Sequence, residues 1–82
     1  MSKYAYKEGQ NVRGMIINVT KDAIYLTVDE DNKAVIYAND LKGYQEGQKL
    51  YDTYYEGQEF EGLVKQITKD KKTGEPLFIL ST

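Results

Sequence analysis

The chain has 82 residues, 13 of them acidic and 11 basic, which gives a formal net charge of -2 at neutral pH. A chain of this length supports one compact core and hence one domain. Cysteine and histidine are both absent, which excludes disulfides, thiolate or imidazole metal sites and a histidine base. No enzymatic activity and no cofactor are therefore expected.

The same composition limits the partners. A negative net charge argues against a strong, nonspecific grip on a phosphate backbone, because that grip depends on many Lys and Arg contacts. No run of residues approaches the ~20 apolar positions of a membrane span, and the first residues do not resemble a signal peptide. We therefore expect a cytoplasmic, monomeric protein with no membrane partner and no DNA partner.

Branched and aromatic residues recur in five short runs that predict strands at residues 11–19, 23–28, 34–38, 59–67 and 77–80. Residues 1–8 are expected to form an extension and residues 9–82 a single domain. In the second run Ile24 and Leu26 alternate with Tyr25 and Thr27, so that one face is core and the other is presented. The core is predicted to consist of Ile16, Ile24, Leu26, Val28, Ile36, Val64, Ile67 and Ile79.

In the third run, Ile36 and Ala38 are predicted to point inward while Val35 and Tyr37 point outward. This choice keeps the smaller side chains where a narrow barrel has least room. It also places Tyr37 on the same outer face of the hairpin as Tyr25.

The first and fourth runs repeat one pattern. Glu8, Gly9 and Gln10 lead into a strand that contains Gly14, and 48 positions later residues 56–58 lead into a strand that contains Gly62. Glycine inside a strand usually marks a bulge or a bend. Two strands entered by the same turn and bent at the same point favour a closed barrel. A third Glu-Gly-Gln, at residues 46–48, lacks the downstream glycine and is predicted to be only a turn.

Residues 39–56 form the longest irregular stretch. Residues 40–43 predict one helical turn closed by glycine. The remainder of residues 39–56 contains too many large apolar and aromatic side chains for a solvated linker. It is predicted to fold over one end of the barrel. The fold class is therefore all-β, a five-stranded antiparallel barrel with a short helical turn between strands three and four.

The order of these features resembles the S-one domain. A glycine-bent strand and a hairpin are followed by Val35-Ile36-Tyr37-Ala38-Asn39-Asp40-Leu41, a long connection and a closing Leu77-Phe78-Ile79-Leu80-Ser81. The resemblance covers residues 9–81 and implies an OB-fold barrel that binds single-stranded RNA. The chain is similar to an N-terminal repeat of the bacterial ribosomal small-subunit protein after which the family is named.

Position by position, the resemblance carries over in part. Gly14 matches the family's bend glycine, Asn39-Asp40-Leu41 its Ser-Glu-Leu turn, and Leu80-Ser81 its terminal Leu-Ser. Tyr25 falls where the family has a base-stacking aromatic, and Tyr37 falls where it usually has a histidine. The chain departs from the family at four positions. Val35 stands where the family usually has a phenylalanine, and Asp22 stands where it often has another aromatic. Thr68 and Leu77 stand near the positions where it has an aspartate and an arginine. Several parts of the usual RNA surface are therefore missing.

Tyr25 and Tyr37 are the candidate base-stacking residues, since an exposed aromatic ring on a strand contributes about 1 to 3 kcal/mol per stacked base. The alternative is a pair of cross-strand aromatics that only stiffen the hairpin. Nearby lysines could meet phosphates. The predicted RNA-binding set is Tyr25, Tyr37, Lys21, Lys33 and Lys65.

A second hypothesis keeps the fold and changes the partner. The negative charge and the missing arginine favour a protein-docking module that anchors a multi-repeat ribosomal protein to the small subunit through a small-subunit ribosomal protein. Its candidate residues are Val35, Tyr44, Tyr51 and Tyr54. The acidic turn at residues 29–32 lacks the central glycine and distal glutamate of a calcium loop, so no metal site is predicted.

Overall fold

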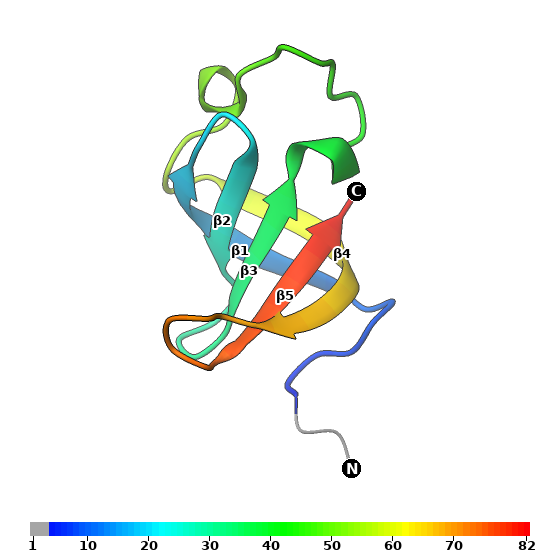
Figure 1. Cartoon of the computed structure of the whole chain (residues 1–82), viewed down its shortest axis with the longest axis vertical. Coiled ribbons are helices and arrows are strands. Elements are labelled where there is room, and N and C mark those ends of the chain that lie inside the picture. The colour runs from blue at the N-terminus through cyan, green and yellow to red at the C-terminus, as the bar shows by residue number, and fades with distance from the viewer. Residues whose placement is uncertain (1–3) are drawn as a thin grey trace.

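The computed structural model describes residues 4–82, which form a closed five-stranded barrel (Figure 1). Its strands are β1 (Asn11–Val19), β2 (Ala23–Thr27), β3 (Lys33–Tyr37), β4 (Glu59–Lys69) and β5 (Pro76–Ser81). Two 3-10 turns, η1 (Ala38–Asp40) and η2 (Leu50–Asp52), lie in the connection from β3 to β4. No helix in residues 4–82 is long and apolar enough to cross a membrane. The predicted barrel is confirmed, and so is a helical turn after the third strand, although this turn lies at Ala38–Asp40 and not at residues 40–43 as predicted.

The strands follow one another around the barrel in the order β1-β2-β3-β5-β4, and β4 pairs back with β1. Four of these pairings are antiparallel, but β3 and β5 are parallel, with Val35 opposite Ile79. An odd number of strands in a closed ring cannot alternate in direction all the way round. The expectation that every pairing is antiparallel is therefore corrected, because closure itself requires a parallel pair.

The barrel interior holds most of the predicted core. Five of the predicted residues are at most 1% exposed, and they are Ile16, Ile24, Leu26, Ile36 and Val64. Val28 and Ile67 pack against them and are partly buried. The prediction for Ile79 was wrong, because Phe78 and Leu80 point into the core and Ile79 lies outside, opposite Val35.

The sequence repeat is a local two-fold relationship between β1 and β4. Arg13 faces Glu61 at the centre of the pairing, and these two residues occupy equivalent positions in the repeat. Both strands shift register at equivalent points, β1 after Ile16 against β2 and β4 after Val64 against β5. The structure thus confirms that the two segments solve the same geometric problem.

The bend glycines also occupy equivalent places. A Cβ atom on Gly14 would lie 2.7 Å from the carbonyl oxygen of Thr27, and one on Gly62 would lie 3.1 Å from the Cβ of Leu80. Both positions therefore bring the backbone against the neighbouring strand. Closing a narrow barrel requires such an approach, and glycine permits it.

The three Glu-Gly-Gln segments form the same turn. In each, the glycine has a positive φ of 89° to 92°, which suits the third position of a type II turn. In each, the glutamine side-chain oxygen accepts a hydrogen bond from the backbone N–H three residues earlier, at 3.2 to 3.3 Å. The glutamines are Gln10, Gln48 and Gln58. The third copy is a turn, as predicted, and it does not lead into a strand.

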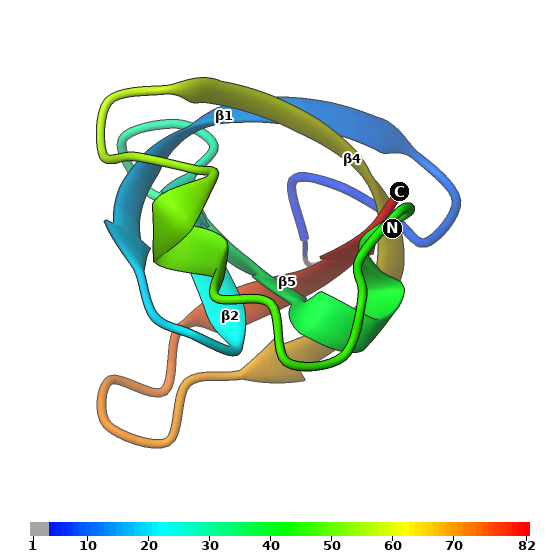
Figure 2. The ribbon, with the colours of Figure 1, turned by 90° about the horizontal axis from the view of Figure 1, so that it is seen from above.

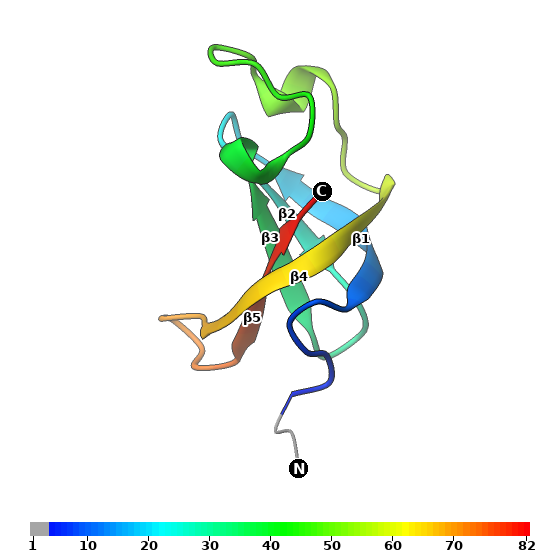
Figure 3. The ribbon, with the colours of Figure 1, turned by 90° about the vertical axis from the view of Figure 1, so that its right-hand side faces the viewer.

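Tyrosines close the two ends of the barrel. Tyr4 and Tyr6 pack edge-on against Phe78, with ring centroids 6.4 and 5.3 Å away. At the other end, Tyr54 packs edge-on against Phe60 at 5.7 Å. Figure 3 shows the N-terminal segment and the β3–β4 connection at opposite ends of the molecule, and Figure 2 shows the connection crossing the barrel mouth. The predicted covering of one end is confirmed.

Candidate nucleic-acid interface

A row of outward-pointing positions crosses the whole barrel wall. It runs from β1 through β2, β3 and β5 to β4, and consists of Asn18, Tyr25, Val35, Ile79 and Gln66, each paired with the next. Val35 was expected to be exposed, but it is 0% exposed. It lies on the middle strand of the face, between the larger side chains of Tyr25 and Ile79, so it forms a buried apolar floor.

Tyr25 and Tyr37 stand on this face and keep 37% and 44% of their surface exposed. They are not directly opposed, because Tyr25 faces Val35 whereas Tyr37 faces Ala23. Within residues 4–82, the ring contacts between aromatic side chains involve other residues. This geometry argues against a stacked pair that merely stiffens the hairpin, and it leaves both rings accessible to a planar ligand.

Two of the predicted lysines border the face. Lys33 begins β3 opposite Thr27 and Leu77, two residues before Val35, and is therefore on the same outer face. Lys21 is exposed in the turn between β1 and β2, next to the end of β3 that carries Tyr37. The two cations thus lie at opposite ends of the tyrosine face.

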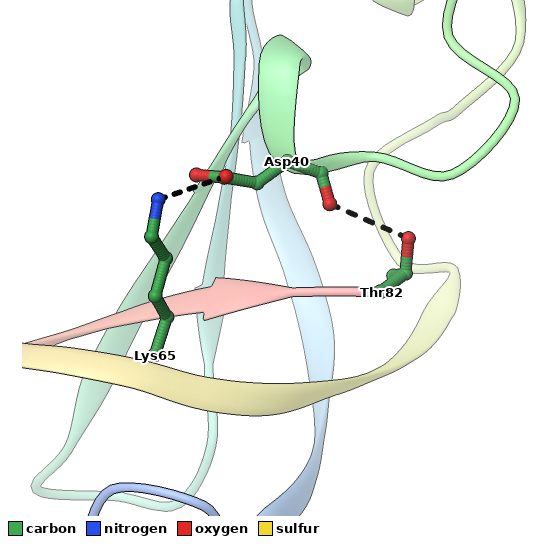
Figure 4. Close-up of polar contacts among 3 residues, drawn as sticks. All are labelled: Asp40, Lys65 and Thr82. Atoms are coloured by element: carbon green, nitrogen blue, oxygen red, sulfur yellow. Dashed lines mark hydrogen bonds and ion pairs between the residues drawn. The ribbon is translucent and has the colours of Figure 1, made fainter.

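Lys65 is placed differently. It lies at the register shift of β4, and its ammonium group is 2.9 Å from the Asp40 carboxylate (Figure 4). The backbone carbonyl of Asp40 also accepts a hydrogen bond from the N–H of Thr82 at 3.0 Å. This cation is therefore occupied in joining β4 to η1, and the structure does not bring it beside Tyr25.

The four predicted docking residues do not form one surface. Val35 is fully buried, and Tyr44 and Tyr54 are partly buried against the core. Tyr51 alone among them is well exposed, at 50%. Sequence reasoning passed over its neighbour Tyr55 as a site residue, although Tyr55 is 65% exposed.

The acidic turn is organised by its own side chains. Asp29 accepts hydrogen bonds from the Tyr6 hydroxyl at 2.6 Å, from the Asp31 N–H at 2.8 Å and from the Asn32 amide at 2.9 Å. The hydrogen bond from Tyr6, followed by that from Asn32, holds the pKa of Asp29 below its ordinary value of 3.8. The same bond raises the pKa of Tyr6 above its ordinary 10.0. Over residues 4–82, no acidic side chains are grouped so as to hold a metal ion.

Comparison with known proteins adds information on the fold. No protein-family model matches the sequence, and no curated protein matches it significantly. Among solved structures, GSP13 from Bacillus subtilis has a TM-score of 0.70 and 16% identity, over 93% of this chain and 55% of that one. The alpha subunit of aIF2 from Pyrococcus abyssi has a TM-score of 0.73 and 20% identity, over 100% of this chain and 30% of that one.

A third match comes from an a/eIF2alpha–aDim2p–rRNA complex of Pyrococcus horikoshii OT3. It has a TM-score of 0.73 and 18% identity, over 95% of this chain and 45% of that one. The chain therefore spans between 30% and 55% of the length of these three matched chains. These likenesses show the fold alone, which is a closed five-stranded barrel of the OB type.

Proposed function

We propose that this barrel is a single-stranded RNA-binding module of a translation-associated protein. The observation that carries the proposal is the pair of exposed tyrosines, Tyr25 and Tyr37, on the outer face of the two strands that form the usual ligand surface of OB folds. Val35 beneath them is fully buried, so the rings stand on a packed floor. An exposed ring of this kind stacks on any base.

The charge distribution supports weak and local binding. Lys33 and Lys21 border the tyrosine face, while Lys65 is paired with Asp40. A strand that meets two cations releases few counterions, so its affinity falls only slightly as salt concentration rises. Stacking, rather than phosphate contact, then supplies most of the affinity.

The fold comparisons add support of a different kind. One of the matched structures is described as a complex that contains rRNA, and another is the alpha subunit of aIF2. Fold alone does not define function. The tyrosine face is therefore the main support for the proposal, and the comparisons are secondary support.

A backbone amide shift titration with a short uridine-rich RNA tests the proposal. We expect saturable shifts around Tyr25, Val35 and Tyr37, with smaller ones at Lys33. Shifts confined to a different side of the barrel, or no shifts at millimolar RNA, would contradict it.

Docking to a small-subunit ribosomal protein is the second candidate, in the manner of an N-terminal repeat of a multi-repeat ribosomal protein. The negative net charge and the exposed ring of Tyr51 favour it. The internal packing of Tyr44 and Tyr54 weakens it. In a pull-down of small ribosomal subunits, capture of subunits by a Tyr25→Ala and Tyr37→Ala double variant would support docking, and failure of the wild type to bind subunits while it binds RNA would remove it.

A further inference from the structure

A second aromatic pocket opens beside the tyrosine face. It has a volume of about 220 Å³ and is lined by Asn18, Val19, Tyr51, Tyr54, Tyr55 and Glu56. The pocket lies between the end of β1 and the segment that carries η2, which Figures 1 and 2 both show near the β1–β2 turn. Tyr54 is anchored on Phe60, but Tyr51 and Tyr55 are 50% and 65% exposed. The rings of Tyr51 and Tyr55 are therefore accessible to solvent, next to the packed ring of Tyr54.

The pocket is continuous with the proposed RNA face. Asn18, which lines the pocket, pairs directly with Tyr25 across β1 and β2. Paired strands lie about 4.8 Å apart. A nucleic-acid strand that stacks a base on Tyr25 and crosses β1 therefore meets this pocket next.

The lining suits a base better than a phosphate. A cavity of about 150 Å³ is enough to hold a benzene ring, so this pocket has room for a planar heterocycle. Asn18 offers an amide, which pairs through two hydrogen bonds with adenine. Glu56 offers a carboxylate, which repels phosphate and accepts hydrogen bonds from an exocyclic amino group. Uracil has no such group.

We propose that this pocket is a second nucleobase subsite, in which Tyr51 or Tyr55 stacks on a base that carries an amino group, adenine in particular. The inference rests on the proposed RNA-binding function and extends it by lengthening the bound strand beyond the Tyr25 and Tyr37 face. It also assigns base stacking to Tyr51, which the sequence had suggested as a docking residue.

The test compares binding of eight-nucleotide adenosine and uridine RNAs by fluorescence anisotropy. The variants are Tyr51→Ala with Tyr55→Ala, and the matched control Tyr51→Phe with Tyr55→Phe, which keeps both rings. The alanine pair is expected to lose affinity for the adenosine RNA by about fivefold or more, in line with the loss of one stacked base. The phenylalanine pair should bind as the wild type does. The preference for adenosine over uridine should disappear in the alanine pair.

Neither ring belongs to the core cluster, so thermal unfolding of both variants should match the wild type. If a variant does not fold, an NMR titration of the wild type provides the test. The chemical shifts of the Asn18 side-chain amide should change on titration with the adenosine RNA. Binding that is unchanged in the alanine pair, or shifts at Tyr25 and Tyr37 without any at Asn18, overturns the subsite and leaves the proposed function standing. An absence of binding by the wild type overturns both.

Discussion

The ammonium group of Lys65 lies 2.9 Å from the Asp40 carboxylate, which ties the register shift of β4 to the turn after β3. The Lys65 side chain is 52% exposed, and an ion pair this exposed contributes about 0 to 1 kcal/mol. The main effect of this ion pair is therefore to hold the ammonium group of Lys65 in place, and its contribution to the stability of the barrel is small.

This placement leads to a prediction about RNA binding. Lys65→Met should leave RNA affinity within about twofold of the wild type and change stability by no more than about 1 kcal/mol. Lys33→Met, on the tyrosine face, should weaken binding and reduce its salt dependence. Fluorescence anisotropy at two salt concentrations checks both. A greater loss of affinity for Lys65→Met than for Lys33→Met would show that phosphates pass near Asp40 instead.

The bend glycines should differ in their tolerance of alanine. Gly14→Ala places a methyl group 2.7 Å from the carbonyl oxygen of Thr27, whereas Gly62→Ala places one no closer than 3.1 Å to the Cβ of Leu80, which is a smaller overlap. We expect a cost of about 1 to 3 kcal/mol for Gly14→Ala and a smaller cost for Gly62→Ala. Urea denaturation measures both free energies of unfolding. Equal costs would mean that the two strands approach their neighbours equally closely.

Sequence patterns predicted the strands where polar and apolar residues alternate. Ile24 and Leu26 in β2 were placed correctly for that reason, and the bounds of β1 were predicted as observed. In the last strand Leu77, Phe78, Ile79 and Leu80 are all apolar, so alternation carries no information about direction. The parallel pairing with β3 decides which of them point inward, and that pairing is not visible in local sequence.

The candidate site was predictable only in part. Tyr25 and Tyr37 follow from alternation in two short strands, and they share the outer face as predicted. The pairing of Lys65 with Asp40 joins residues that are 25 positions apart, so no local pattern reveals it. The same holds for Asn18 and Tyr55, which come together only because the β3–β4 connection folds back over the barrel.

The glutamine of each Glu-Gly-Gln turn should contribute through its side-chain oxygen. Gln10→Ala and Gln58→Ala each remove one hydrogen bond to a backbone N–H and should lower the free energy of unfolding by about 0.5 to 1.5 kcal/mol. Gln10→Glu and Gln58→Glu retain an acceptor oxygen and should cost less. Chemical denaturation separates the two series. Alanine variants as stable as the wild type would show that the turn depends on its glycine alone.

The hydrogen bond between Tyr6 and Asp29 should make stability depend on pH. Because the bond lowers the pKa of Asp29 in the folded state, its contribution is present above the ordinary pKa of 3.8 and is lost as pH falls through the lower folded value. Tyr6→Phe removes the donor. The difference in Tm between wild type and Tyr6→Phe should be constant from about pH 5 to about pH 8 and should shrink below about pH 4. If the difference in Tm is equally large in strong acid, it arises from lost packing and not from the hydrogen bond to Asp29.

The most direct test of RNA binding by the tyrosine face is the affinity of the Tyr25→Ala and Tyr37→Ala double variant for an eight-nucleotide uridine-rich RNA, measured beside the Tyr25→Phe and Tyr37→Phe control. Both rings are partly exposed and lie outside the core, so the alanine variant should remain folded, which its Tm verifies. The proposal predicts a loss of about thirtyfold or more in the alanine variant, from two stacked bases, and near wild-type affinity in the phenylalanine control. A folded alanine variant that binds this RNA as tightly as the wild type would contradict it.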